Sequence, residues 1–317
     1  MKNPIEFPPN FDVQHNVPLA EFTNIRIGGP ADYLCTITDQ NIFIALYRFC
    51  LEMNIPFLAL GDGTNVFFPE SGFRGLVAII KFDKMNVVAK NAVVSEAGAT
   101  LDQIRLLCID KGLAGFEFAS GIPGTLGGAI YGNAGAYGSN VGEILTRAKI
   151  LTLDGTVQFV EKNFFKFAYR HSDLKVHPAF ILQAELQLSK GDSSAIKSRC
   201  DEIISIRTNK LPLADTPTAG SWFKNIKDEF GNATAAAKYL DAIGSKQTSV
   251  SDAAVHVKHA NIFYNKGNAT ATDMLRLQDI LQERVYQKFG IRLEREVMYI
   301  QQSHCERSRS ETPSAPA

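Results

Sequence analysis

The sequence predicts an α+β protein with two domains, and three observations lead to this class. Strand-helix-strand units alternate with β-hairpin patterns, which does not fit a regular doubly wound sheet. The chain has 317 residues, 45% of them hydrophobic, enough for two cores. A proline cluster, LPLADTP at 211–217, separates two series of elements. We predict a first domain over 1–206, a smaller α+β domain over 207–301 and a disordered tail over 302–317.

The first series opens with a strand-like run at 31–37, followed by a segment at 39–54 whose apolar residues have helical spacing. A buried strand at 55–61 comes next and ends in GDGTN, so that a glycine loop follows a strand. Further strands are expected at 76–82 and 91–98.

The later elements follow from capping and turn signals. Thr100 and Gln103 form a capping box for a helix over 101–112, which Gly112 ends. The remaining expected elements are a hairpin at 149–160 turning on Asp154-Gly155, a strand at 180–188, and helices at 193–210 and 271–290.

Charge and hydropathy exclude several classes of partner. Lys plus Arg equals Asp plus Glu at 33 each, so no overall field favours nucleic acid or an anionic membrane. No apolar run approaches the roughly 20 residues that span a bilayer, and the first residues carry no apolar signal segment. We expect a cytoplasmic protein, monomeric by default, without a membrane or nucleic-acid partner.

The five cysteines are odd in number, widely spaced and without a CxxC pair, so we expect reduced and mostly buried thiols. His256 and His259 form an HxxH pair, but a zinc site needs a third ligand that the neighbouring sequence does not offer. We therefore expect a structural role for both histidines and no metal. Trp222, the one tryptophan, is expected to pack between the domains.

The stretch 117–138, EFASGIPGTLGGAIYGNAGAYG, concentrates seven of the 24 glycines in 22 residues. Its interspersed apolar residues distinguish it from a flexible linker. Fixing each glycine costs about 0.5–1 kcal/mol more than fixing alanine, so we expect a compensating ligand whose phosphate or ring atoms approach the backbone closely. Tight turns in a compact loop are the alternative. Neither GxxxxGK[ST] nor a GxGxxG after a strand is present, which disfavours a P-loop or Rossmann site.

Seven motifs follow one another along the chain: RIGGPAD (26–32), LGDGTN (60–65), SGIPGTLGGAIYGNAGAYG (120–138), YRHS (169–172), TAGSWFKN (218–225), KHANIFYNKGNATATD (258–273) and FGIRLEREV (289–297). In this order they resemble the UDP-N-acetylenolpyruvoylglucosamine reductase family, in its shorter form without the extra tyrosine-bearing loop.

The resemblance implies a vanillyl-alcohol-oxidase (PCMH) type FAD-binding domain, followed by the smaller substrate-binding domain. FAD would be bound non-covalently, because no histidine or cysteine lies in the two glycine loops. Glycines would let the dinucleotide approach where side chains would collide. The residues that would surround FAD are Arg26, Gly28, Gly61, Asp62, Gly63, Thr64, Asn65, Ser120, Gly121, Ile122, Pro123, Gly124, Thr125, Gly127, Gly128, Asn133, Ala134 and Gly135.

The resemblance also implies a reaction: NADPH reduces FAD, and a hydride from flavin N5 then reduces the enolpyruvyl group of a UDP-sugar in peptidoglycan precursor synthesis. Arg170 would hold the substrate carboxylate, Glu296 would stabilise the enol-like intermediate, and Ser221 would donate the proton. Tyr169, Lys224 and Asn225 would bind the substrate, the last two at its diphosphate. Outside the motifs, a surface ion pair, a solvated carboxylate and a helix N-cap would be the ordinary interpretations of Arg170, Glu296 and Ser221.

Three positions depart from the family pattern: Asp62 stands where glycine is usual, Ile226 where proline is usual, and Met298 where arginine is usual. None of them removes a catalytic candidate. Two alternatives stay open at this point. One is another flavin oxidase or dehydrogenase of the same superfamily, and the other is a nucleotide-binding protein without activity.

Overall fold

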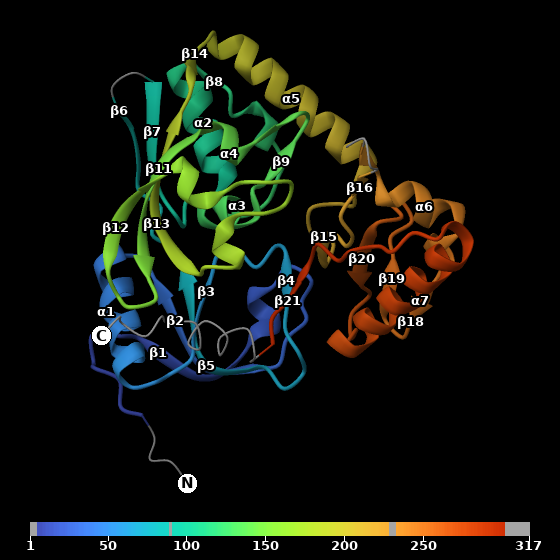
Figure 1. The fold of residues 1–317 in the computed structure, drawn as a ribbon, viewed down its shortest axis with the longest axis horizontal. Helices are drawn as coiled ribbons and strands as arrows, with labels where there is room; N and C mark the ends of the chain where they lie inside the picture. Colours follow the sequence, from blue (N-terminus) through green and yellow to red (C-terminus); the bar gives the residue numbers. More distant parts are fainter. Residues whose placement is uncertain (1–4, 89–90, 228–232, 302–317) are drawn as a thin grey trace, which may run out of the picture.

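The computed structural model describes residues 5–88, 91–227 and 233–301. Its first part holds two sheets packed next to each other (Figure 1). The four-stranded sheet has the order β1-β2-β5-β3, in which β2, β5 and β3 run parallel. Its elements are β1 (Val13–Pro18), β2 (Pro30–Ile37), α1 (Gln40–Glu52), β3 (Phe57–Leu60) and β5 (Phe73–Ile80). The central strand β5 is buried along nearly its whole length, as expected where both faces are covered.

The second sheet is antiparallel, in the order β12-β11-β13-β7-β6. Helices α2 and α5 pack against each other beside it, and α3 contacts β13 and β7. The elements are β6 (Met85–Val88), β7 (Ala92–Glu96), α2 (Leu101–Lys111), α3 (Leu126–Gly132), α4 (Val141–Ile144), β11 (Leu145–Thr152), β12 (Val157–Glu161), β13 (Ala179–Gln187) and α5 (Ser193–Lys210).

Beyond α5 lies a smaller unit, drawn in orange to red in Figure 1, with a sheet of order β15-β20-β19-β18 next to two helices. Its elements are β15 (Thr218–Ser221), α6 (Ala236–Ala242), β18 (Ser249–Val250), β19 (Ala253–Val255), β20 (Ile262–Asn265) and α7 (Ala271–Phe289). The α7 helix opens with a Thr270–Asp273 capping box and ends at Gly290 in the left-handed region.

Short elements complete the described chain. The 3-10 helices are η1 (Leu19–Phe22), η3 (Glu117–Ala119), η4 (Lys162–Phe165), η5 (Asp173–Lys175) and η6 (Ser245–Gln247). The short strands are β4 (Val66–Phe67), β8 (Leu113–Ala114), β9 (Gly135–Ala136), β10 (Ser139–Asn140), β14 (Ser189–Lys190), β16 (Ile226–Lys227), β17 (Ala233–Thr234) and β21 (Met298–Tyr299). Among them β21 pairs in parallel with β4, which returns the end of the described chain to the first glycine loop.

One hydrophobic cluster joins the smaller unit to the larger one. Trp222 is fully buried in it, stacked on Phe263 at 4.6 Å and 5.3 Å from Phe67 of β4, ring centroid to ring centroid. Asn24 donates a hydrogen bond of 2.7 Å to the carbonyl of Thr218. The prediction that Trp222 packs between the two parts is confirmed.

The predicted order of elements is confirmed from the strand at 31–37 to the helix at 271–290, including the Thr100 capping box and the Asp154-Gly155 hairpin. The glycine-rich stretch differs from a plain loop, because its Leu126–Gly132 segment is helical, with Thr125 as the N-cap. Cys35, Cys50, Cys108 and Cys200 are buried, as expected. The fifth, Cys305, lies outside the described residues, as does the predicted tail over 302–317.

Within the described ranges, no helix is both long and apolar enough to cross a membrane.

Candidate active site

The two glycine loops lie against each other. The first, 61–65, follows β3, and the second, 120–128, leads into α3. A Cβ atom on Gly61 would collide with the Thr125 hydroxyl and approach its Cγ2 to 3.2 Å. The Thr64 hydroxyl donates a hydrogen bond of 3.4 Å to the carbonyl of Pro123. Glycine at position 61 is therefore required by the protein's own packing, a reason that the sequence did not reveal.

Two glycines of α3, Gly128 and Gly132, have more room around them. A Cβ on Gly128 would meet the Thr125 hydroxyl at an ordinary 3.6 Å, and one on Gly132 would meet no atom of the described chain within 4 Å. Ser120 is completely buried, and its hydroxyl has no hydrogen-bond partner among the described residues. Buried hydroxyls normally have partners, so this one is suited to bind a group from outside the chain.

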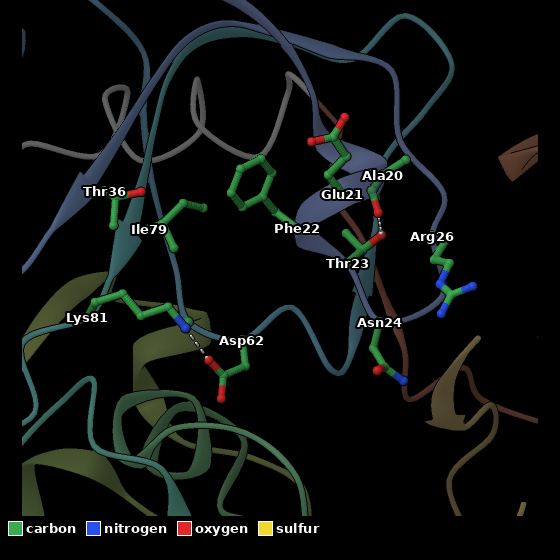
Figure 2. A pocket seen from close by; sticks show the side chains of 11 residues that line it. Ala20, Glu21, Phe22, Thr23, Asn24, Arg26, Thr36, Asp62, Ile79 and Lys81 are labelled. Atoms are coloured by element: carbon green, nitrogen blue, oxygen red, sulfur yellow. Dashed lines mark hydrogen bonds and ion pairs between the residues drawn. The ribbon is translucent and has the colours of Figure 1, made fainter. Parts of the chain in front are cut away.

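A cavity of about 700 Å³ lies beside the first glycine loop, and Figure 2 shows its lining. Three predicted cofactor residues line it, namely Arg26, Gly61 and Asp62. The Asp62 carboxylate pairs with the Lys81 ammonium at 2.8 Å (Figure 2). This pairing offsets the negative charge that replaces glycine in the loop, and it makes the departure compatible with an anionic ligand nearby.

Arg170 and Glu296, distant in sequence, meet in the structure. Arg170 Nε lies 2.8 Å from Glu296 Oε1, although the N–H is not directed at an acceptor and Nε has no hydrogen-bond partner within the described chain. Arg170 Nη1 donates to the carbonyl of Gly135 at 3.2 Å. The backbone of Arg170 has φ of 53°, in the left-handed region. Non-glycine residues held there cost about 1–3 kcal/mol and cluster at functional sites.

Backbone pairing brings Glu296 next to Ser221. The amide of Glu296 donates to the carbonyl of Trp222 at 2.8 Å, and the amide of Lys224 donates to that of Glu294 at 2.9 Å. Ser221 is the last residue of β15, where a register irregularity and Gly220, with φ of 78°, precede it. Such bulges redirect side chains near active sites. The backbone of Glu296 is thus held beside Trp222, the residue after Ser221, while the Glu296 side chain pairs with Arg170.

The electrostatics of Glu296 are set by burial and by three cations. Its side chain is 15% exposed, and desolvation raises its pKa, while Arg170, Lys175 and Lys224 act in the opposite direction. Burial prevails, so that Glu296 holds a proton to higher pH than an ordinary glutamate. A carboxyl in this state can donate as well as accept a hydrogen bond.

Two of the predicted substrate residues, Tyr169 and Asn225, are in contact across the two units. The Tyr169 hydroxyl accepts a hydrogen bond of 3.3 Å from the amide of Asn225, and the Lys227 ammonium lies 5.4 Å from the Tyr169 ring centroid. Lys224 forms an ion pair with Glu294, whose side chain is 71% exposed. An anionic ligand could replace so exposed a partner at small cost.

The other two departures from the family pattern have structural explanations. Met298 lies in β21, where its amide donates to the carbonyl of Asn65 at 3.0 Å and its side chain packs on the cluster around Leu19 and Phe68. An arginine there would place a charge against apolar neighbours. Ile226 begins β16 and packs on the cluster that contains Trp222.

Sequence reasoning missed two cations. Lys175 lies five residues after Arg170, so extending the YRHS motif by one helical turn could have found it. Arg207 donates from Nε to the carbonyl of Gly121 at 3.0 Å, beside the second glycine loop. The helical pattern of α5 contains no signal for that contact.

The HxxH histidines accept hydrogen bonds within their own turn: His256 Nδ1 from the amide of Lys258 at 3.1 Å, and His259 Nδ1 from that of Asn261 at 3.3 Å. Burial lowers the pKa of both rings. These bonds are the structural role expected of them. Among the described residues, no group of three potential metal ligands occurs.

Two family models match the chain. One, described as an FAD binding domain, covers residues 31–161, and the other, the C-terminal domain of UDP-N-acetylenolpyruvoylglucosamine reductase, covers 211–300. Together with the glycine loops and the half-buried Arg170–Glu296 pair, they define an FAD-containing oxidoreductase. The predicted fold class, a PCMH-type FAD domain followed by a smaller α+β domain, is confirmed.

Whole-chain relatives identify the family. The chain is 35% identical to the UDP-N-acetylenolpyruvoylglucosamine reductase of Clostridium novyi (91% of this chain, 92% of that one). It is 37% identical to that of Caldanaerobacter subterraneus subsp. tengcongensis (90% and 92%). A solved structure of the Thermus caldophilus reductase superposes with a TM-score of 0.73 at 26% identity, covering 91% and 98%. The chain belongs to the UDP-N-acetylenolpyruvoylglucosamine reductase family.

The residues present fit FAD, the cofactor of this family. The orphaned Ser120 hydroxyl, the open approach to Gly128 and the cavity that carries Arg26 suit a large anionic dinucleotide. Flavin supplies hydride chemistry when bound.

Proposed function

We propose that this protein uses NADPH and FAD to reduce the enolpyruvyl group of UDP-N-acetylglucosamine enolpyruvate, giving UDP-N-acetylmuramate for peptidoglycan precursor synthesis. The observation that carries the proposal is the Arg170–Glu296 pair, together with the backbone bond from Glu296 to Trp222, the residue that follows Ser221. These contacts bring together the YRHS, TAGSWFKN and FGIRLEREV motifs. The names of the relatives support the choice of substrate.

Arg170 is proposed to hold the substrate carboxylate. Its planar guanidinium can bind a carboxylate through two parallel N–H donors. One ion pair with Glu296 at 2.8 Å and one bond to Gly135 use only part of its donors. The carboxylate would gain negative charge as the double bond is reduced, so a fixed cation would stabilise the transition state more than the ground state.

Ser221 and Glu296 are proposed to bring about the proton transfer to the substrate. When bound, FAD would supply the hydride for the terminal enolpyruvyl carbon, and the adjacent carbon would need a proton. Ser221 would donate it, because a hydroxyl suffices as an acid toward a strongly basic enol-like intermediate. Glu296, with its raised pKa, would stabilise that intermediate as a neutral hydrogen-bond donor.

Lys224, Asn225 and Tyr169 are proposed to bind the nucleotide part of the substrate. The exposed ion pair of Lys224 with Glu294 leaves its ammonium able to exchange partners toward a diphosphate. The hydrogen bond between the Asn225 amide and the Tyr169 hydroxyl would hold together the two segments that carry these substrate-binding residues. We retain the predicted division into domains 1–206 and 207–301 as part of this proposal.

The test is a visible spectrum of the purified protein under anaerobic conditions, while NADPH and then the enolpyruvyl UDP-sugar are added. A flavin band that bleaches with NADPH and returns with the sugar would support the proposal. A band that returns with oxygen and not with the sugar would favour the oxidase alternative instead.

A further inference from the structure

We propose that Lys175 is a positioning residue of this reaction: it fixes Arg170 in its left-handed backbone conformation and supplies a third positive charge facing Glu296. This inference rests on the proposed function and deepens it. Lys175 closes η5, five residues after Arg170.

The first line of support is a direct bond to the strained residue. Lys175 Nζ donates to the backbone carbonyl of Arg170 at 2.8 Å, and φ of Arg170 is 53°. A left-handed conformation persists only where the surroundings over-determine it. The Lys175 bond acts on the carbonyl of this residue and so opposes relaxation to an ordinary backbone angle.

The second line of support is the anchoring of the whole turn on α3. Lys175 Nζ lies 5.6 Å from the centroid of the Tyr131 ring, a distance at which a cation is attracted to an aromatic face. The Ser172 hydroxyl, fully buried, donates to the carbonyl of Tyr131 at 2.7 Å. Segment 170–175 is therefore tied at two points to the helix that follows the second glycine loop.

The third line of support is electrostatic. The charged groups facing Glu296 are Arg170 and Lys175 from one segment and Lys224 from the other, and all three lower its pKa against the larger effect of burial. Lys175 as a whole is exposed, yet partial desolvation lowers the pKa of its ammonium. Removing this cation should let burial raise the pKa of Glu296 further.

Three variants separate charge from hydrogen bonding. Lys175→Met removes both, Lys175→Gln removes the charge and keeps an N–H donor for the Arg170 carbonyl, and Lys175→Arg keeps both. Lys190→Met, an exposed lysine in β14 at the far end of the larger unit, is the matched control (Figure 1). Circular dichroism would establish that each variant folds.

The first measurement needs no substrate. The Glu296 carboxyl is titrated by carbon-13 NMR in holoenzyme with labelled glutamate, assigned with Glu296→Gln. We expect the titration midpoint to move to higher pH in Lys175→Met and Lys175→Gln, and to stay in place in Lys175→Arg and the control. An unmoved midpoint in the first two would overturn the electrostatic part of the proposal.

The second measurement separates the two half-reactions. We expect Lys175→Met to slow flavin reoxidation by the sugar about 10–100-fold, by analogy with a displaced transition-state donor, and Lys175→Gln to recover part of the rate. Flavin reduction by NADPH should stay unchanged. A raised KM for the sugar with unchanged kcat would make Lys175 a substrate contact and overturn the positioning role. Wild-type flavin that the sugar fails to reoxidise would instead refute the proposed function, while the NMR titration would still decide the charge effect.

Discussion

Arg170 Nε and Glu296 Oε1 lie 2.8 Å apart, yet the Nε–H of Arg170 makes no aligned hydrogen bond in the described structure. The two opposite charges are therefore close together, but no well-aligned hydrogen bond holds them in one geometry. A residue in a strained backbone conformation, with a donor left over, is suited to accept a second carboxylate. We therefore expect the guanidinium to shift its hydrogen bonds toward the substrate when the sugar binds.

Arg170→Lys should be poorly tolerated. An ammonium keeps the charge but loses the planar pair of donors, so we expect the rate of sugar reduction to fall about 10²-fold. Stopped-flow measurement of flavin reoxidation checks this. Arg199→Lys is the control, because Arg199 pairs with Glu202 on the exposed face of α5. Near-normal turnover of Arg170→Lys would remove Arg170 from the carboxylate site.

Ser221→Ala should separate the half-reactions. Flavin reduction by NADPH should remain nearly intact, while reoxidation by the sugar should slow at least the roughly 10²–10⁴-fold expected for a lost general acid. Single-turnover kinetics of both steps test this, with the exposed Ser249 of β18 changed to alanine as control. Equal slowing of both steps would contradict the proton-donor role.

Local signals predicted much of the fold. Thr100 with Gln103 predicted α2, and the apolar spacing of 271–290 predicted α7, because a cap or an amphipathic face is encoded within a few residues. The pairing of Met298 with Val66 was not predictable, because a two-residue strand carries no periodicity. The division between residues 206 and 207 stays a prediction, and α5 continues beyond it to Lys210.

In the candidate site, too, some residues were predictable from the sequence and others were not. Arg170, Ser221 and Glu296 came from ordered motifs, and the structure brings their segments together. Lys175 was missed because its role depends on a bond to a backbone carbonyl and on the Tyr131 ring. Contacts of this kind depend on the tertiary fold, and no residue type or spacing indicates them.

The raised pKa of Glu296 predicts a pH dependence with a definite sign. If the neutral acid is the working form, flavin reoxidation by the sugar should be complete below that pKa and should decline as pH rises through it. Glu296→Gln should lack this inflection, because an amide does not titrate. A pH profile of the half-reaction from the usual glutamate value of 4.5 upward provides the measurement. An identical profile in wild type and Glu296→Gln would exclude Glu296 as the titrating group.

The raised pKa of Glu296 should also make the stability of the protein depend on pH. Because the folded pKa is raised by burial, the native state keeps a proton that the unfolded chain has already lost above pH 4.5. The free energy of unfolding contributed by Glu296 should therefore be present below 4.5 and be lost as pH rises toward the folded pKa. Denaturant titrations at several pH values should show this slope in wild type and a shallower one in Glu296→Gln.

Substituting two glycines with different surroundings would distinguish the two explanations of the glycine-rich loops, which are packing within the protein and close approach of FAD. Gly61→Ala would force a Cβ against Thr125, so we expect a loss of about 1–3 kcal/mol in the free energy of unfolding, with or without FAD. Gly128→Ala meets open space and lies in α3, so the apoprotein should keep its stability or gain up to about 1 kcal/mol. Its FAD affinity should fall at least about tenfold, or 1.4 kcal/mol, if the cofactor approaches that backbone. Unfolding of the apoprotein and flavin titration measure the two effects independently. Unchanged FAD affinity in Gly128→Ala would mean that this glycine serves the helix and its contacts, and that the dinucleotide approaches the loop elsewhere.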